Sequence, residues 1–182
     1  GAAATNDIGG VVDHLLRLGR GPVLVFTESR REALNHATAF GQSRPRVGIG
    51  IALAQQLDLF SEPTESSDQL RENAERRVAF HTADLSPQER QVIEGGFTDG
   101  KFEVCFATST LAAGVNFPFR TIVFSKLTYR YGDRAGSHVV RSDYRNMSGR
   151  AGRLGMHADG FAVLLPQNNV ELAHANMLVL PD

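Results

Sequence analysis

Short apolar runs alternate with amphipathic stretches along this 182-residue chain. Five runs are almost entirely apolar, as in strands buried on both faces of a sheet; they cover residues 23–26, 78–80, 102–107, 121–125 and 161–165. Between them the apolar positions recur with helical spacing. The predicted helices span about residues 8–18, 30–40, 47–60, 69–77 and 87–97, and another opens near Ser142. This alternation predicts an α/β domain with a mainly parallel sheet and helices on both faces.

Local signals set several of these boundaries. Ser86-Pro87-Gln88-Glu89 predicts a helix start, with Ser86 as the cap, Pro87 at the first position and Glu89 in the first turn. Residues 61–68 predict a polar loop, and residues 69–77 an exposed helix. Gly1-Ala2-Ala3-Ala4 suggests that residues 1–7 are a ragged terminus or cloning scar, which leaves residues 8–182 as a single domain.

Composition excludes several classes of protein. Hydrophobic residues make up 42% and charged residues 21%, as in ordinary globular domains. The single cysteine, Cys105, cannot form a disulfide within the chain or supply a cysteine-rich zinc site. No apolar run approaches the roughly 20 residues that span a bilayer, and no signal-peptide pattern begins the chain. We therefore expect no membrane association and an intracellular protein, cytoplasmic or in the nucleoid or nucleus.

The charges balance overall but are segregated along the chain. Between Arg120 and Arg153 there are seven arginines and one lysine against two aspartates. Between Asp58 and Glu103 there are eleven acidic residues against five basic ones. An arginine-rich stretch suits phosphate recognition, because the guanidinium is a planar forked donor, although a solvated surface would give the same pattern.

One segment partly matches the sequence motif of a phosphate-binding loop. Gly95-Gly96-Phe97-Thr98-Asp99-Gly100-Lys101 fits G-x-x-x-x-G-K, but Phe102 stands where a Ser or Thr should bind Mg²⁺. The segment also closes a predicted helix and enters a strand, which is the reverse of the order a phosphate loop needs. It therefore predicts a helix C-cap and turn.

Candidate binding residues cluster after three predicted strands, where parallel α/β sheets bind ligands. The three loops are residues 27–30, 81–85 and 108–118. Their hydroxyls and free N–H groups suit contacts with a phosphate backbone, and Asn116 can hydrogen-bond a ribose hydroxyl. His81 is expected to hydrogen-bond within its loop, because the six histidines are too scattered for a metal cluster.

The most specific segment is Asn146-Met147-Ser148-Gly149-Arg150-Ala151-Gly152-Arg153. Its two arginines, three residues apart, suit phosphoryl transfer, in which negative charge spreads over equatorial oxygens. A surface arginine pair at a glycine-rich helix end is the structural alternative.

Four segments in this order carry a resemblance to a known family. Residues 23–30, 81–90, 108–118 and 146–153 resemble motifs IV, IVa, V and VI of superfamily 2 helicases. The sequences of the last two segments are most similar to those of the Ski-like DExH-box branch. The resemblance covers roughly residues 8–166. It implies that the chain is the second, C-terminal RecA-like domain of a longer ATP-dependent helicase. Such a domain would have a three-layer fold and would be inactive when isolated.

The resemblance also implies roles for particular residues. The catalytic ones would be Arg150 and Arg153 as arginine fingers, with Asn146 where the family usually has Gln. ATP would contact Gly114, Asn116 and Gly149, while the first RecA-like domain would hold most of the ATP and the Mg²⁺. Contacts with the DNA or RNA backbone would come from Thr27, Ser29, Arg30, His81, Thr82, Thr108 and Ser109.

Two departures from the family pattern keep an alternative open. The family more often has His-His-Ala-Gly where this chain has His81-Thr82-Ala83-Asp84, and Asn146 is shorter than Gln. A non-catalytic nucleic-acid-binding or protein-interaction module with the same fold would tolerate both. A dehydrogenase-type nucleotide-binding enzyme is less well supported, because no G-x-G-x-x-G follows the first strand.

Overall fold

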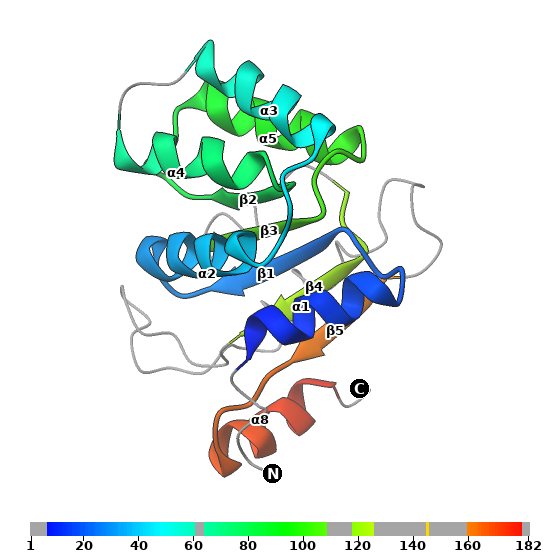
Figure 1. Cartoon of the computed structure of the whole chain (residues 1–182). Coiled ribbons are helices and arrows are strands. Elements are labelled where there is room, and N and C mark those ends of the chain that lie inside the picture. The colour runs from blue at the N-terminus through cyan, green and yellow to red at the C-terminus, as the bar shows by residue number, and fades with distance from the viewer. Residues whose placement is uncertain (1–6, 61–63, 109–117, 126–144, 146–159, 180–182) are drawn as a thin grey trace.

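The computed structural model describes residues 7–60, 64–108, 118–125, 145 and 160–179. In this part of the chain, five parallel strands form one sheet in the order β2-β3-β1-β4-β5 (Figure 1). Their bounds are β1 Val23–Thr27, β2 Val78–His81, β3 Val104–Thr108, β4 Thr121–Phe124 and β5 Phe161–Leu164. All five coincide with predicted apolar runs, which confirms the parallel sheet.

The helices match most of the predicted ones. They are α1 Ile8–Arg17, α2 Arg30–Gln42, α3 Gly48–Asp58, α4 Glu65–Ala74, α5 Pro87–Thr98 and α8 Asn169–Val179. Ser86 and Glu89 form the capping box at the start of α5. Helix α8 was not predicted, because its apolar residues do not recur on one side of a helix. In the structure Val170, Leu172 and Met177 are exposed. The helix expected near Ser142 lies outside the described residues.

The prediction for α4 was wrong in two respects. The helix begins at Glu65 rather than Gln69, because the Thr64 side chain caps it by accepting a 3.1 Å hydrogen bond from the Ser67 N–H. It is not an exposed helix either, since Leu70, Asn73 and Ala74 are buried where α4 packs against α2, α3 and β2.

Helices cover both faces of the sheet. Phe106 on β3 lies against His36 and Phe40 of α2, with ring centroids 6.2 and 6.3 Å apart. His81 on β2 instead faces Glu94 of α5. His81 pairs in register with Ala107, the residue after Phe106, and successive strand residues point to opposite faces. Helices α2 and α5 therefore lie on opposite faces, as expected for a three-layer α/β domain.

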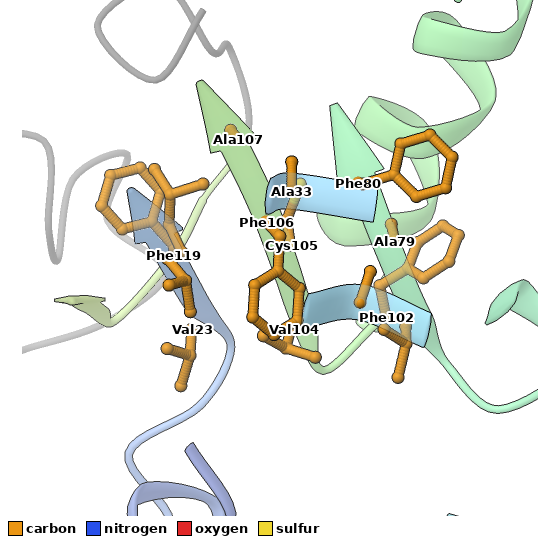
Figure 2. Packing of buried hydrophobic residues seen from close by; sticks show 14 of the residues in the cluster. Val23, Ala33, Ala79, Phe80, Phe102, Val104, Cys105, Phe106, Ala107 and Phe119 are labelled. Atoms are coloured by element: carbon orange, nitrogen blue, oxygen red, sulfur yellow. The ribbon is translucent and has the colours of Figure 1, made fainter. Parts of the chain in front are cut away.

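Aromatic residues form much of the core between these layers. Figure 2 shows Phe80, Phe102 and Phe106 among the buried side chains of β2, β3 and the segment before β3. Fully burying a side chain of this size contributes about 1.5–3 kcal/mol. Cys105 is wholly buried in the same layer, and desolvation raises the pKa of its thiol. Among the described residues, no helix is long and apolar enough to cross a membrane.

Residues 95–101 form the predicted helix end and turn. The Lys101 N–H donates to the Gly96 carbonyl over 2.7 Å, and the Gly100 N–H donates to the Phe97 carbonyl over 3.1 Å. Gly100 has φ of +69°, which suits glycine. The chain then enters β3, so the apparent phosphate-loop match is a helix C-terminus.

Candidate functional site

The carboxyl ends of three neighbouring strands bring the predicted loops together. Thr27 at the end of β1 pairs in register with Thr108 at the end of β3. His81 at the end of β2 pairs with Ala107. Residues that are far apart in the sequence therefore share one edge of the sheet, called here the carboxyl edge, in the order β2-β3-β1 (Figure 1).

The threonines at this edge differ in accessibility. Thr27 is fully buried, and its hydroxyl donates a 3.0 Å hydrogen bond to the Ala107 carbonyl, which joins β1 to β3. Thr108 is only half-buried. The Thr27 side chain thus stabilises the sheet by linking two strands, whereas Thr108 is accessible to solvent at the carboxyl edge.

Helix α2 begins directly at the carboxyl edge. The Ser29 hydroxyl caps it by accepting from the Glu32 N–H at 3.2 Å. Arg30, the first helical residue, has an exposed side chain. Free N–H groups at a helix start favour an anion, and an adjacent guanidinium adds to that preference. The start of α2 therefore places the exposed Arg30 guanidinium at the carboxyl edge, in the same turn as the Glu32 carboxylate.

His81 lies at the end of β2 with its side chain packed toward α5. Its Nε2 is 3.6 Å from Oε1 of Glu94. Burial and the nearby Arg90 charge lower the His81 pKa to about 4, so the contact joins a neutral imidazole to Glu94 at neutral pH. Burial raises the Glu94 pKa, partly offset by Arg90. The expected hydrogen bond within the loop was wrong, because the strand continues through His81 and directs the ring to α5.

Asp84 connects the loop after β2 to the start of α4. Its carboxylate accepts a hydrogen bond from the Ser66 hydroxyl at 2.6 Å and another from the buried Thr82 hydroxyl. Ser66 was not predicted as a site residue, because residues 61–68 were predicted to form a loop. The signal available was Thr64, a good cap residue, followed by acidic residues in the first turn of α4.

An open groove of about 460 Å³ lies beside these residues. Its walls carry two guanidiniums, from Arg30 and Arg31, and two carboxylates, from Glu65 and Asp84. Of these four residues only Arg30 was predicted as a binding residue, since Arg31 and Glu65 look like ordinary residues of exposed helix surfaces.

Seven predicted site residues lie outside the described part of the chain. They are Ser109, Gly114, Asn116, Asn146, Gly149, Arg150 and Arg153. Among the residues that the structure describes, no group of His, Cys, Asp and Glu could hold a metal ion. The structure therefore describes the predicted residues at the ends of β1, β2 and β3. The predicted contacts with the nucleotide lie outside it and stay predictions.

The chain matches a known domain family over most of its length. The model of the helicase conserved C-terminal domain matches residues 52–155, more than half of the chain. The chain belongs to this family. A helicase C-terminal domain is a RecA-like α/β domain, in agreement with the parallel sheet and its helices. The match includes the predicted motifs after β2 and β3 and the arginine-rich segment 146–153.

Curated relatives of this helicase C-terminal domain are much longer proteins. It is 35% identical over 158 residues to the ATP-dependent DNA helicase Hel308 of Pyrobaculum calidifontis, covering 84% of this chain and 22% of that protein. Hel308 of Thermoplasma volcanium is 35% identical over 144 residues, 79% of this chain and 20% of the relative. The DExH-box ATP-dependent RNA helicase DExH10 of Arabidopsis thaliana is 26% identical over 180 residues, which cover 94% of this chain and 18% of the relative. The chain thus spans about a fifth of these relatives.

Proposed function

We propose that this chain is the second RecA-like motor domain of an ATP-dependent nucleic-acid helicase or translocase of the Ski-like DExH-box branch. The observation that carries the proposal is the family match over residues 52–155, which includes three of the four motif-like segments in order. The fourth segment, residues 23–30, contains Thr27, which lies beside Thr108 on the neighbouring strand. DNA helicases and an RNA helicase among the relatives support the nucleic-acid class.

In the proposed mechanism, a first RecA-like domain of the full-length protein holds ATP and Mg²⁺. When the two domains close, Arg150 and Arg153 reach the nucleotide and stabilise the charge that develops during phosphoryl transfer. Asn146 contacts the γ-phosphate or the attacking water, and Gly114, Asn116 and Gly149 contact the nucleotide. Closure thereby couples hydrolysis to movement of the nucleic acid.

The carboxyl edge is the proposed contact with the nucleic-acid backbone. Arg30 and the start of α2 supply positive charge there, and Thr108 is accessible beside them, followed by Ser109. Thr27, His81 and Thr82 are buried, so we assign them the support of this edge in the described conformation. Contacts of this kind recognise phosphates rather than bases.

Arg153→Ala in the full-length protein tests the catalytic part of this proposal. We expect nucleic-acid-stimulated ATPase activity to fall by about a hundredfold or more, because an arginine finger supplies roughly 10³–10⁵ in rate. Arg17→Ala is the matched control, since Arg17 is exposed on α1, away from the carboxyl edge, and pairs with Asp13. Steady-state ATPase assays with single-stranded DNA and single-stranded RNA measure both variants and identify the preferred strand.

An Arg153→Ala rate within fivefold of wild type would remove Arg153 from the catalytic role. A wild-type full-length protein that binds nucleic acid but hydrolyses no ATP with either strand would favour the non-catalytic module instead.

A further inference from the structure

The Asp84 carboxylate is held in a fixed position at the edge of the groove. Its two oxygens accept from different hydroxyls, Ser66 on α4 and Thr82 at the end of β2. Thr82 is itself buried and cannot follow a moving carboxylate. Two bonds to separate elements therefore prevent the Asp84 side chain from turning away when an anion arrives.

The same carboxylate interacts electrostatically with Arg30. Partial burial acts to raise the Asp84 pKa, but the hydrogen bonds from Ser66 and Thr82, one from its own backbone and the Arg30 charge outweigh it and leave the pKa below its usual value. Asp84 is thus ionised at neutral pH. Arg30 is not part of any ion pair among the described residues. Its guanidinium is attracted to the Asp84 carboxylate, and its N–H donors remain available to a ligand.

We propose that Asp84 is a positioning residue whose fixed negative charge limits how tightly Arg30 binds a phosphate of the nucleic-acid backbone. The inference rests on the proposed function, because it takes the carboxyl edge as the nucleic-acid contact. A phosphate that approaches Arg30 gains the attraction of the guanidinium and meets the repulsion of Asp84 in the same groove. Such a charge weakens binding and speeds release of the strand, which a translocating motor needs in every cycle.

Asp84→Asn tests the inference in the full-length protein. The amide keeps an oxygen acceptor and removes the charge. We expect about three- to tenfold tighter binding of a fluorescein-labelled 20-nucleotide single strand at low salt, and a smaller gain at high salt, because surface charge effects are screened. Fluorescence anisotropy across a salt series measures the dissociation constant. In ATPase assays the half-saturating strand concentration falls correspondingly, whereas a merely structural defect would raise it.

Three further variants separate charge from structure. Asp99→Asn makes the same chemical change at an exposed site after α5, at the opposite edge of the sheet, and should leave binding within twofold of wild type. Ser66→Ala removes one bond but keeps the Asp84 charge, so it should not tighten binding. In an Arg30→Ala background the gain from Asp84→Asn should largely disappear, since coupled residues are not additive.

The possible results show separately whether the Asp84 inference fails or the proposed function fails. Salt-dependent binding by the wild type without tightening by Asp84→Asn overturns the inference alone. A gain that persists undiminished without Arg30 also overturns it, because Asp84 would then act on the strand directly. A wild-type protein that binds neither DNA nor RNA overturns the proposed function and this inference together.

Discussion

Two residues at the carboxyl end of β2 and in the loop that follows it occupy opposite electrostatic environments. His81 is buried against α5, where desolvation and Arg90 disfavour its charged form and lower its pKa to about 4. Asp84, three residues later, is exposed and its charged form is stabilised by hydroxyl donors and by Arg30. The chain thus keeps one side chain neutral and the other charged at the same edge of the sheet. Only the second carries a charge that can repel an anion at neutral pH.

The His81 environment predicts a loss of stability in mild acid. Because its pKa is lower in the folded state than the ordinary value of 6.5, the unfolded chain binds the proton more tightly. Stability from this group is complete above about pH 6.5 and falls as the pH drops toward 4, by up to about 1.4 kcal/mol per pH unit. Urea unfolding of the 182-residue chain at pH 7.5 and pH 5 measures the change.

His81→Gln, which cannot be protonated in this range, should show a smaller loss between the two pH values, whatever its stability at pH 7.5. The exposed His14 gives the matched control, since His14→Gln should retain the wild-type pH dependence. Equal pH dependence in the wild type and His81→Gln would contradict a buried neutral imidazole.

At the scale of single elements, helix starts decide how the carboxyl edge is arranged. The Ser86 hydroxyl accepts from the Glu89 N–H at 3.1 Å, and the Ser86 N–H donates to Glu89 Oε1 at 2.9 Å. This helix start was predicted from residues 86–89, because the residues that cap it are close in the sequence. The start of α4 was missed, because Thr64 follows a proline-containing stretch and the buried side of α4 is short. What fixes α4 is its packing on α2, α3 and β2.

Removing the cap of α5 should cost measurable stability. We expect Ser86→Ala to lower the free energy of unfolding by about 1 kcal/mol, because the Glu89 N–H at the helix start loses its acceptor. Ser86→Thr keeps the hydroxyl and should stay closer to wild type. Urea denaturation at pH 7.5 compares the three proteins, and an alanine variant as stable as the wild type would show that the Ser86 hydroxyl does not stabilise the helix.

Across the whole molecule, the two edges of the sheet use their arginines differently. At the edge where the strands begin, Arg44 and Arg77 both pair with Glu103, and Arg77 also donates to the Lys101 carbonyl at 2.8 Å. These guanidiniums are occupied in holding turns together. At the carboxyl edge, Arg30 takes part in no ion pair among the described residues and remains available to a ligand. The overall balance of charge hides this asymmetry.

The fold also predicts the behaviour of the 182-residue chain without further domains. Because residues 95–101 close a helix instead of opening one, they cannot cradle ATP phosphates with free N–H groups. We expect no ATP turnover above background from the highly purified chain, with or without single-stranded nucleic acid. A coupled ATPase assay measures it. Turnover that Lys101→Ala abolishes would contradict the assignment of this segment as a turn.

The sequence by itself determined the strands, most helix starts and the helicase resemblance, because these depend on neighbouring residues: apolar runs, caps, and motifs in order along the chain. It also placed the three loops at one edge, since parallel strands end together. Only the tertiary structure decided which side chains of those loops are accessible. Thr27 and Thr82 looked like surface hydroxyls, but packing between distant segments buries them. The bond from Ser66 to Asp84 spans 18 residues and depends on α4 lying beside β2, which no local pattern specifies.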